Sequence, residues 1–322
     1  MENSIRVGVS NLLIEVLQEG KNLINDFDEL LAQAEVLEVS TMSIAAPYDS
    51  DTLKAIKLAE ERGLIETILV GDKTRIREAA AEVGYKLNKA EVINIADDSE
   101  AALEAVRQVH IGNAAFVMKG LISSATILKA VLHQDFGLRT GQLLSYVAAL
   151  DIPKSDRLLF MTDPAINIKP SLEEKVDIVQ NSISMAHALG VKNPKVAALA
   201  AIEIENEKMP ATLDAAALAK MNAEGKITGG IVDGPLAFDN AVSLKAKKRK
   251  GIKSEVAGRA DIFLVPYIEV GNVLYKALTY YADTKIAGIV MGARTPVAMS
   301  SRADDHVNKL TSIALGKVVA NY

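Results

Sequence analysis

Hydroxyl groups, cations and carboxylates gather in one segment of the chain, residues 292–308, which reads GARTPVAMSSRADDHVN. Just before it, the run 286–291 (IAGIVM) is apolar throughout, which predicts a parallel strand buried on both faces. After it, apolar residues spaced three to four apart predict a helix with Ser300 or Ser301 as its N-cap. Because the first N–H groups of a helix attract anions, we expect this turn and the Arg302 guanidinium to bind an anion.

The pair Ser301 and Asp304 also has a structural interpretation that needs no ligand. The two residues are three apart, which resembles a capping box with Asp in place of the usual Glu. In such a box the two side chains bond backbone N–H groups at the start of a helix. The residue types alone therefore leave a helix cap and an anion site open as alternatives.

The composition narrows the class of protein. With 322 residues, 49% of them hydrophobic, the chain is long enough for two domains with large cores. No apolar run approaches the roughly 20 residues of a membrane span, and the N-terminus lacks the basic and apolar regions of a signal peptide. We therefore expect a cytoplasmic protein that does not bind membranes. The net charge of −5 argues against general nucleic-acid binding.

Several cofactor and metal chemistries are excluded by the same inspection. The sequence contains no cysteine, which rules out disulfides, thiolate metal sites and a covalent thiol intermediate on the protein. Its four histidines share no ligand spacing, and no HExxH, GxxxxGK[ST] or strand-following GxGxxG motif is present. We therefore expect no metal site. The basic cluster between Lys245 and Lys253 is typical of a solvated helix end, with phosphate binding as the alternative.

Short apolar strands alternate with amphipathic helices along most of the chain, which predicts βαβ units and an α/β fold. The predicted helices span residues 11–34, 51–62, 73–83, 99–109, 125–132, 171–189, 211–222 and 272–280. The predicted strands, besides 286–291, span residues 41–46, 67–71, 91–95, 114–118, 143–150, 157–161, 196–201, 227–232 and 261–265. We interpret 137–141 (GLRTG) as a hinge between two α/β lobes that enclose a cleft.

Four segments carry a family resemblance, and their order and spacing run through most of the chain. They are 118–141 (MKGLISSATILKAVL, then GLRTG), 162–175 (TDPAINIKPSLEEK), 253–278 (KSEVAGRADIFLVPYIEVGNVLYKAL) and 292–305 (GARTPVAMSSRADD). Together they resemble the phosphate acetyltransferase and phosphate butyryltransferase family, and within it the butyryl branch.

The resemblance implies two α/β/α lobes with mainly parallel sheets and an interdomain cleft, an architecture shared with isocitrate and isopropylmalate dehydrogenases. It implies a first lobe of residues 1–138 and 295–322, with 139–294 as an inserted second lobe. It further implies reversible transfer of a short acyl group between coenzyme A (CoA) and inorganic phosphate, which gives acyl phosphate. We expect butyryl or branched four- to five-carbon groups to be preferred, CoA to be a substrate, no cofactor to be needed, and a homodimer or larger homo-oligomer to form.

Carried over residue by residue, the resemblance implies a catalytic serine–arginine pair at Ser301 and Arg302. The aspartate that serves as a proposed base in the acetyl branch, seven residues after the serine, is Asn308 here. An amide cannot accept a proton at neutral pH. Asp304 and Asp305 are therefore the candidates for the base, and Asp304 is the one that we include among the catalytic residues.

Further residues are expected to bind substrate. Lys129 stands where the acetyl branch has an arginine, and Pro164 stands where the family has a cysteine, so no thiol acts at that position. Ser123 and Ser124 either cap a helix or contact phosphate. Asn167 either contacts substrate or only holds its loop through Asx-type bonds. The other predicted substrate-binding residues are Lys119, Arg139, Thr140, Asn272, Arg294 and Asn308.

Direct attack within a ternary complex is the mechanism that we expect, because no cysteine is present, although Ser301 could in principle form an ester. Three other functions stay open. The first is a phosphate acetyltransferase with acetyl-CoA as its main substrate. The second is a dehydrogenase of the same architecture, although the sequence shows no trio of aspartates at metal-binding spacing. The third is a non-catalytic binding protein, which Asn308 keeps possible.

Overall fold

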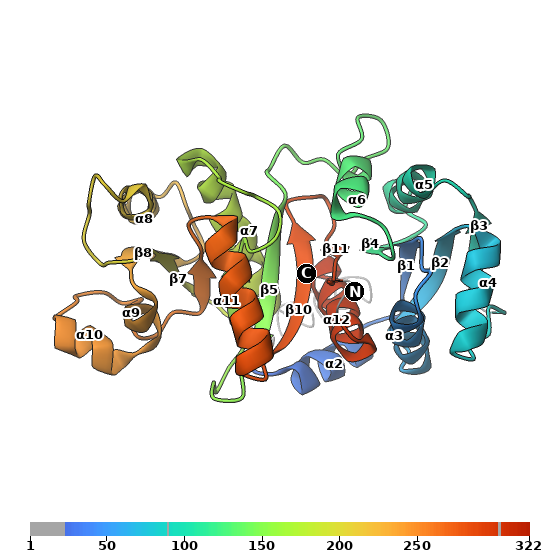
Figure 1. The fold of residues 1–322 in the computed structure, drawn as a ribbon, viewed down its shortest axis with the longest axis horizontal. Helices are drawn as coiled ribbons and strands as arrows, with labels where there is room; N and C mark the ends of the chain where they lie inside the picture. Colours follow the sequence, from blue (N-terminus) through green and yellow to red (C-terminus); the bar gives the residue numbers. More distant parts are fainter. Residues whose placement is uncertain (1–22, 89, 302–303) are drawn as a thin grey trace, which may run out of the picture.

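The computed structural model describes residues 23–88, 90–301 and 304–322. Within these residues, eleven strands form one continuous sheet, shown in Figure 1. From one edge to the other its strands are β3 (Glu91–Asn94), β2 (Ile65–Gly71), β1 (Ser40–Ala45), β4 (Phe116–Lys119), β11 (Val297–Ala298), β10 (Lys285–Met291), β5 (Ser145–Asp151), β6 (Leu159–Thr162), β9 (Ile262–Leu264), β7 (Lys195–Leu199) and β8 (Ile231–Leu236). The predicted α/β fold with a mainly parallel sheet is confirmed.

The direction of β10 differs from the prediction. We expected a parallel strand, but β10 is antiparallel to both of its neighbours, β5 and β11. Its core residues are fully buried, as the apolar run indicated. An unbroken apolar run reports that both faces of a strand are covered, and it carries no information about the direction of the neighbours. β5 is likewise antiparallel to β6, so the direction of the strands changes at the middle of the sheet.

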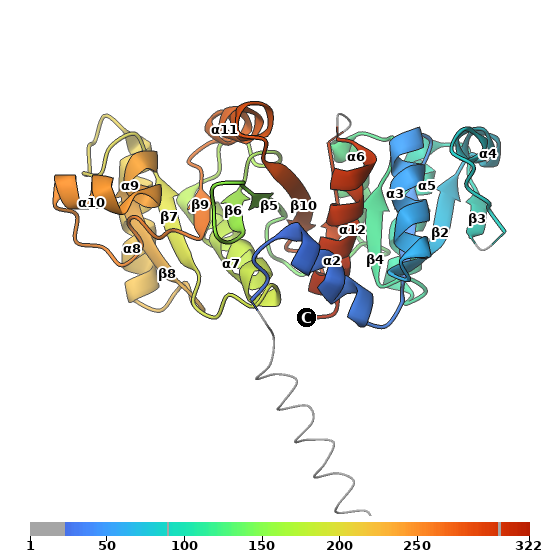
Figure 2. The same cartoon turned by 90° about the horizontal axis from the view of Figure 1, so that it is seen from below.

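Eleven helices of the described chain cover the sheet, as Figures 1 and 2 show. They are α2 (Phe27–Val36), α3 (Ser50–Glu61), α4 (Lys73–Glu82), α5 (Asp98–His110), α6 (Ser124–Val131), α7 (Leu172–Ala188), α8 (Pro210–Ala223), α9 (Phe238–Val242), α10 (Leu244–Lys250), α11 (Ile268–Tyr281) and α12 (His306–Ala320). The short α9 and α10 were not predicted. α10 carries most of the basic cluster and buries none of its residues, as a solvated helix does.

Three predicted elements begin elsewhere than expected. The helix predicted at 11–34 is helical, in its described part, only from Phe27, because Asp26 is extended and caps α2 by accepting from the Glu29 N–H. Its residues 11–22 lie outside the described residues. The strand predicted at 227–232 is β8, which starts at Ile231, and it includes a glycine and a proline that are rare in strands. The helix predicted at 272–280 starts at Ile268.

The C-terminal helix also begins later than predicted. Asp305, and neither Ser300 nor Ser301, caps α12, because its carboxylate accepts from the Asn308 N–H at 2.9 Å. α12 lies beside α2 and α3 (Figure 2) and also packs against β10. It is buried continuously from Lys309 to Val318. The chain reaches α12 through the short strand β11, which we did not predict.

Strand β11 links the two halves of the sheet. It pairs with β4 on one side and with β10 on the other, so the sheet is continuous and not divided into two. The boundaries expected for the two lobes, 1–138 with 295–322 and 139–294, stay a prediction. Residues that follow β4, β6 and β11 line one common cavity.

Candidate active site

A cavity of about 200 Å³ lies where segments from the two halves of the sheet come together. Five separate elements contribute to it: the start of α6, strand β5, the loop after β6, helix α11 and the turn after β11. One part of its wall is polar and another is apolar. The lining residues are Ser124, Tyr146, Pro164, Ala165, Asn272, Tyr275, Lys276, Met299, Ser300 and Ser301.

The turn that contains Ser301 is closed by Asp304. The Ser301 N–H donates to Asp304 Oδ2 at 2.7 Å, and the Asp304 N–H donates to the Ser301 carbonyl at 3.2 Å. This is half of the bonding expected for a capping box, but it closes a turn and not a helix start, since α12 begins only at His306. The helix start expected at this turn is therefore wrong, whereas the expectation that the turn binds an anion stays a prediction. Arg302, the predicted partner of Ser301, lies outside the described residues.

Asp304 is the better placed of the two candidate bases. Burial raises its pKa, against the bond from the Ser301 N–H and the positive charges of Lys309 and Lys119, which lower it. Asp304 precedes Asp305, the N-cap of α12, and so lies outside the first turn of that helix. A raised pKa makes a carboxylate a stronger base. Asp305, by contrast, is exposed and is used as the cap of α12.

Two buried lysines lie close to this turn. Lys309, on α12, donates from Nζ to Ser300 Oγ and to the Ser301 carbonyl, each at 3.3 Å. Lys119, at the end of β4, donates to the carbonyls of Gly120 (3.1 Å) and Ile122 (3.4 Å). Lys119 was a predicted site residue, and the structure buries it beside the turn without making it part of the cavity wall.

Tyr146 and Tyr275 form the inner wall of the cavity. Their hydroxyl groups lie near each other, and burial raises the pKa of both phenols. Tyr146 reaches across β10 at Gly288, where a Cβ atom would lie only 1.7 Å from the Tyr146 hydroxyl oxygen. Asp304 raises both pKa values further through its negative charge. The two phenols are therefore neutral hydrogen-bonding groups.

The loop after β6 is organised by Asp163. Its carboxylate accepts from the N–H groups of Ala165 (2.9 Å) and Ile166 (3.0 Å) and from Asn167 Nδ2 (2.6 Å). Asn167 therefore holds its loop, which is the structural alternative that the sequence left open. Asn272, one of the predicted substrate-binding residues, lines the cavity, and its amide lies 3.4 Å from the Pro164 carbonyl.

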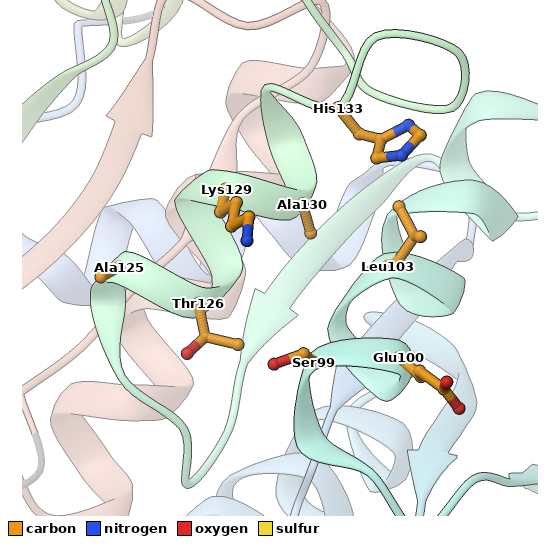
Figure 3. A pocket seen from close by; sticks show the side chains of 8 residues that line it. All are labelled: Ser99, Glu100, Leu103, Ala125, Thr126, Lys129, Ala130 and His133. Carbon is orange, nitrogen blue, oxygen red and sulfur yellow. The ribbon is translucent and has the colours of Figure 1, made fainter.

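Lys129 faces a second, larger groove. This groove has a volume of about 550 Å³ and lies between α5 and α6, as Figure 3 shows. Its walls carry Ser99, Glu100, Leu103, Ala125, Thr126, Lys129, Ala130 and His133. Ser124 lines the first cavity and its neighbour Ala125 lines this groove, so the two hollows lie on either side of the start of α6. Ser123 caps that helix by accepting from the Thr126 N–H at 3.0 Å.

Four other predicted residues lie outside the cavity wall. Arg294 places Nη2 3.1 Å from His110 Nδ1 and 3.4 Å from the Gly137 carbonyl. Thr140 donates to the Gly292 carbonyl at 2.5 Å, so both residues hold the 137–141 segment in place. Arg139 is exposed, and Asn308 lies in the first turn of α12, where its backbone N–H donates to the Asp305 carboxylate. Of the predicted residues, the structure thus brings together Ser124, Asn272 and Ser301 in the cavity wall. Asp304 and Lys119 lie next to the Ser301 turn, outside that wall.

Sequence reasoning missed several residues of this site. Lys309 and Tyr146 stood within segments that were interpreted as an apolar helix and an apolar strand. A lysine within the apolar spacing of a helix and a tyrosine within an apolar strand were the signals that could have drawn attention to them. Among the described residues, no three or more His, Asp or Glu side chains are grouped so that they could hold a metal ion.

Comparison with known proteins identifies the family. Residues 98–316, more than half of the chain, match the family described as phosphate acetyl/butaryl transferase. The chain belongs to this family. Our family prediction is therefore confirmed, the chain is an acyltransferase, and the dehydrogenase and binding-protein alternatives are set aside.

Relatives over nearly the full length agree with the family match. The phosphate butyryltransferase of Clostridium acetobutylicum is 48% identical over 92% of this chain and 99% of its own length. A branched-chain phosphotransacylase from Enterococcus faecalis V583 has a similar structure, with a TM-score of 0.76 and 32% identity, over 87% of this chain and 99% of that one.

The dehydrogenase-like architecture that we predicted is also seen in a structural neighbour. A 4-hydroxythreonine-4-phosphate dehydrogenase from Klebsiella pneumoniae has a TM-score of 0.52 at 14% identity, covering 87% of this chain and 99% of that chain, which is a likeness of fold alone. None of the helices in the described part of the chain has both the length and the apolar character needed to cross a bilayer.

Proposed function

We propose that the cavity beside Ser301 transfers a short acyl group from acyl-CoA to inorganic phosphate, with butyryl or branched four- to five-carbon groups preferred. The observation that carries the proposal is the divided lining of the cavity. Ser124, Ser301 and Lys276 supply hydroxyl and ammonium groups suited to a phosphate, while Pro164 and Met299 supply an apolar wall suited to an alkyl chain. Each methylene that packs against such a wall contributes about 1–3 kcal/mol to the discrimination between longer and shorter acyl groups.

Chemically, the transfer is a direct exchange at the acyl carbonyl. A phosphate oxygen attacks the thioester carbon, the C–S bond breaks, and the CoA sulfur leaves as a thiolate that takes up a proton. In the reverse direction the thiol loses that proton and attacks the carbonyl of the acyl phosphate, and phosphate leaves. Donors from the Ser301 turn and the Arg302 guanidinium stabilise the negative charge that develops on the carbonyl oxygen.

We assign to Asp304 the role of the base that accepts the proton of the CoA thiol. A CoA thiol resembles a free cysteine thiol, whose pKa is about 8.5, so a nearby carboxylate with a raised pKa helps to form the thiolate. Asn308 stands where the acetyl branch has its base, and Asp305 is engaged as a helix cap. Asp304 is thus the carboxylate next to Ser301 that is left for this role.

Lys129 and its groove are suited to another part of CoA. The groove and the cavity reach the start of α6 at the neighbouring residues Ala125 and Ser124, and Lys129 in the groove offers a cation to a phosphate group. We keep the prediction that Lys129 binds substrate, and we assign it to the phosphate-bearing portion of CoA. A cytoplasmic location and a homodimer or larger homo-oligomer also stay predictions.

A substrate series tests the proposal against its main alternative. Initial rates of phosphate-dependent thiol release are compared for acetyl-, propionyl-, butyryl- and isobutyryl-CoA. We expect kcat/KM for the four-carbon substrates to exceed that for acetyl-CoA by about ten-fold or more. If acetyl-CoA is the best substrate, the protein is a phosphate acetyltransferase. Absence of thiol release with all four would defeat the proposal as a whole.

A further inference from the structure

Lys309 is a buried cation for which the proposed reaction scheme has so far no role. Only 5% of the residue is exposed. An ammonium group has three N–H donors, and two of them reach Ser300 Oγ and the Ser301 carbonyl, each at 3.3 Å. Both acceptors belong to the turn that lines the cavity. Burying a charge is costly unless it is paired, so a charge retained at this position calls for an anionic partner.

The charged groups near Lys309 are compatible with an anionic partner. Asp304 is the carboxylate whose pKa Lys309 lowers, and Lys119 acts on the same carboxylate with a second positive charge. Asp305 adds a further negative charge but is exposed to water, which screens it. Among the described residues, Lys309 and Lys119 therefore place two buried ammonium groups beside this turn. Their positive charges attract an anion such as a phosphate dianion.

The hydroxyl group of Ser300 connects Lys309 to the cavity. Because Lys309 donates to Ser300 Oγ, the oxygen acts as an acceptor and the Ser300 hydroxyl proton is left to donate elsewhere. Ser300 is itself 6% exposed and lines the cavity. A phosphate oxygen in the cavity is an acceptor for that proton. Bonds to charged groups are the stronger ones among hydrogen bonds in proteins.

We propose that Lys309 is a positioning residue that orients the Ser300 hydroxyl toward inorganic phosphate and supplies the buried positive charge that retains it. This inference rests on the proposed function and assigns the phosphate subsite within it. Ser300 contacts the phosphate, whereas Lys309 acts through Ser300 and through its charge. Ser301 and Arg302 keep the roles already given to them at the reacting carbonyl.

The test compares Lys309→Met and Ser300→Ala with the wild type. Methionine keeps the length of the side chain and removes the charge and the donors. We expect each variant to raise the KM for phosphate by about ten-fold or more, as loss of a bond to a charged group does. The KM for butyryl-CoA should stay within about three-fold of the wild-type value, because the subsite concerns phosphate alone.

Lys317 provides a matched control. It is a fully buried lysine on the same helix, and its Nζ donates to the Leu37 carbonyl, away from the cavity. Lys317→Met removes a buried cation from α12 without touching the turn, so the KM for phosphate should be unchanged. A double variant, Lys309→Met with Ser300→Ala, should be no worse than Lys309→Met alone, because the two residues act as one unit.

Calorimetric titration with inorganic phosphate separates this inference from the proposed function. Weaker phosphate binding in Lys309→Met and Ser300→Ala, but not in Lys317→Met, supports the subsite even if no acyl transfer is found. If the wild type releases thiol and Lys309→Met and Ser300→Ala keep its KM and its affinity for phosphate, the reaction stands and the Lys309 inference is overturned. An equal rise of both KM values in Lys317→Met would assign the effect to folding and would also overturn it.

Discussion

Asp304 is the single residue on which proton transfer depends in this account. It bonds the Ser301 N–H at 2.7 Å, and burial raises its pKa from the ordinary carboxyl value. A base must be ionised to act, so activity should be full above the raised pKa and should fall as the pH drops through it. We expect Asp304→Asn to lower kcat by about 100-fold or more and to remove this acidic limb of the pH–rate profile.

Asp305→Asn is the control for that experiment. Asp305 caps α12 and is exposed, so the substitution should cost at most about 1 kcal/mol in stability and leave the shape of the pH profile unchanged. If both variants keep the wild-type profile, the thiol loses its proton to another group, such as the phosphate substrate itself.

Arg302 is the second residue with a specific expectation, although it lies outside the described residues. A guanidinium next to Ser301 supplies a fork of donors to a developing oxyanion. We expect Arg302→Ala to lower kcat/KM by at least about 100-fold while the protein stays folded. Arg302→Lys should recover little of the loss, since a point charge does not reproduce the fork. Near-normal turnover in a folded Arg302→Ala protein would remove this turn from the active site.

At the scale of elements, strand β10 makes room for the wall of the cavity. Gly288 lets Tyr146 cross the strand, and a Cβ atom there would meet the phenol at 1.7 Å. Gly288→Ala should therefore destabilise the protein by about 1–3 kcal/mol and disturb the Tyr146–Tyr275 pair, which lowers activity as well. Thermal unfolding and turnover, measured on the same preparation, check both effects.

Gly63→Ala serves for comparison. Gly63 has a φ of +70°, but nothing lies within 4 Å of the position that its Cβ would occupy. The substitution should cost about 1 kcal/mol from backbone strain and should not alter turnover. A Gly288→Ala protein that is as stable and active as the Gly63→Ala protein would contradict the packing described for Tyr146.

The same elements show how far the sequence predicts this structure. Hydrophobic periodicity located most strands and helices to within a few residues, as for α4, predicted at 73–83 and observed at Lys73–Glu82. It could not supply the direction of β10, because burial on both faces looks alike in parallel and antiparallel neighbours. It misplaced the start of α12, because Ser301 and Asp305 are both good caps by residue type and tertiary packing decides between them.

The candidate site was predicted only in part, for a similar reason. Ser301, Ser124 and Asn272 were found because polar residues at turns stand out in a sequence. Tyr146 and Lys309 were not, since their importance arises from long-range contacts with α11 and with the turn after β11. Arg294 and Thr140 were polar turn residues too, and the structure engages them in holding a loop.

At the scale of the whole molecule, the cavity is assembled from both halves of the continuous sheet. A site of this kind can hold both substrates at once, and the chain has no cysteine to carry the acyl group between them. Initial-rate plots for CoA and acyl phosphate should therefore intersect, as a ternary complex requires. Parallel lines, or an acyl group found on Ser301 in a quenched reaction, would show a covalent route instead.

Thiol release from butyryl-CoA, followed as the concentration of inorganic phosphate is varied, tests the central claim most directly. The account predicts that release rises with phosphate to a plateau and that one molecule of butyryl phosphate forms for each thiol released. Release that proceeds equally without phosphate, giving free butyrate, would make the protein a thioesterase and contradict the account.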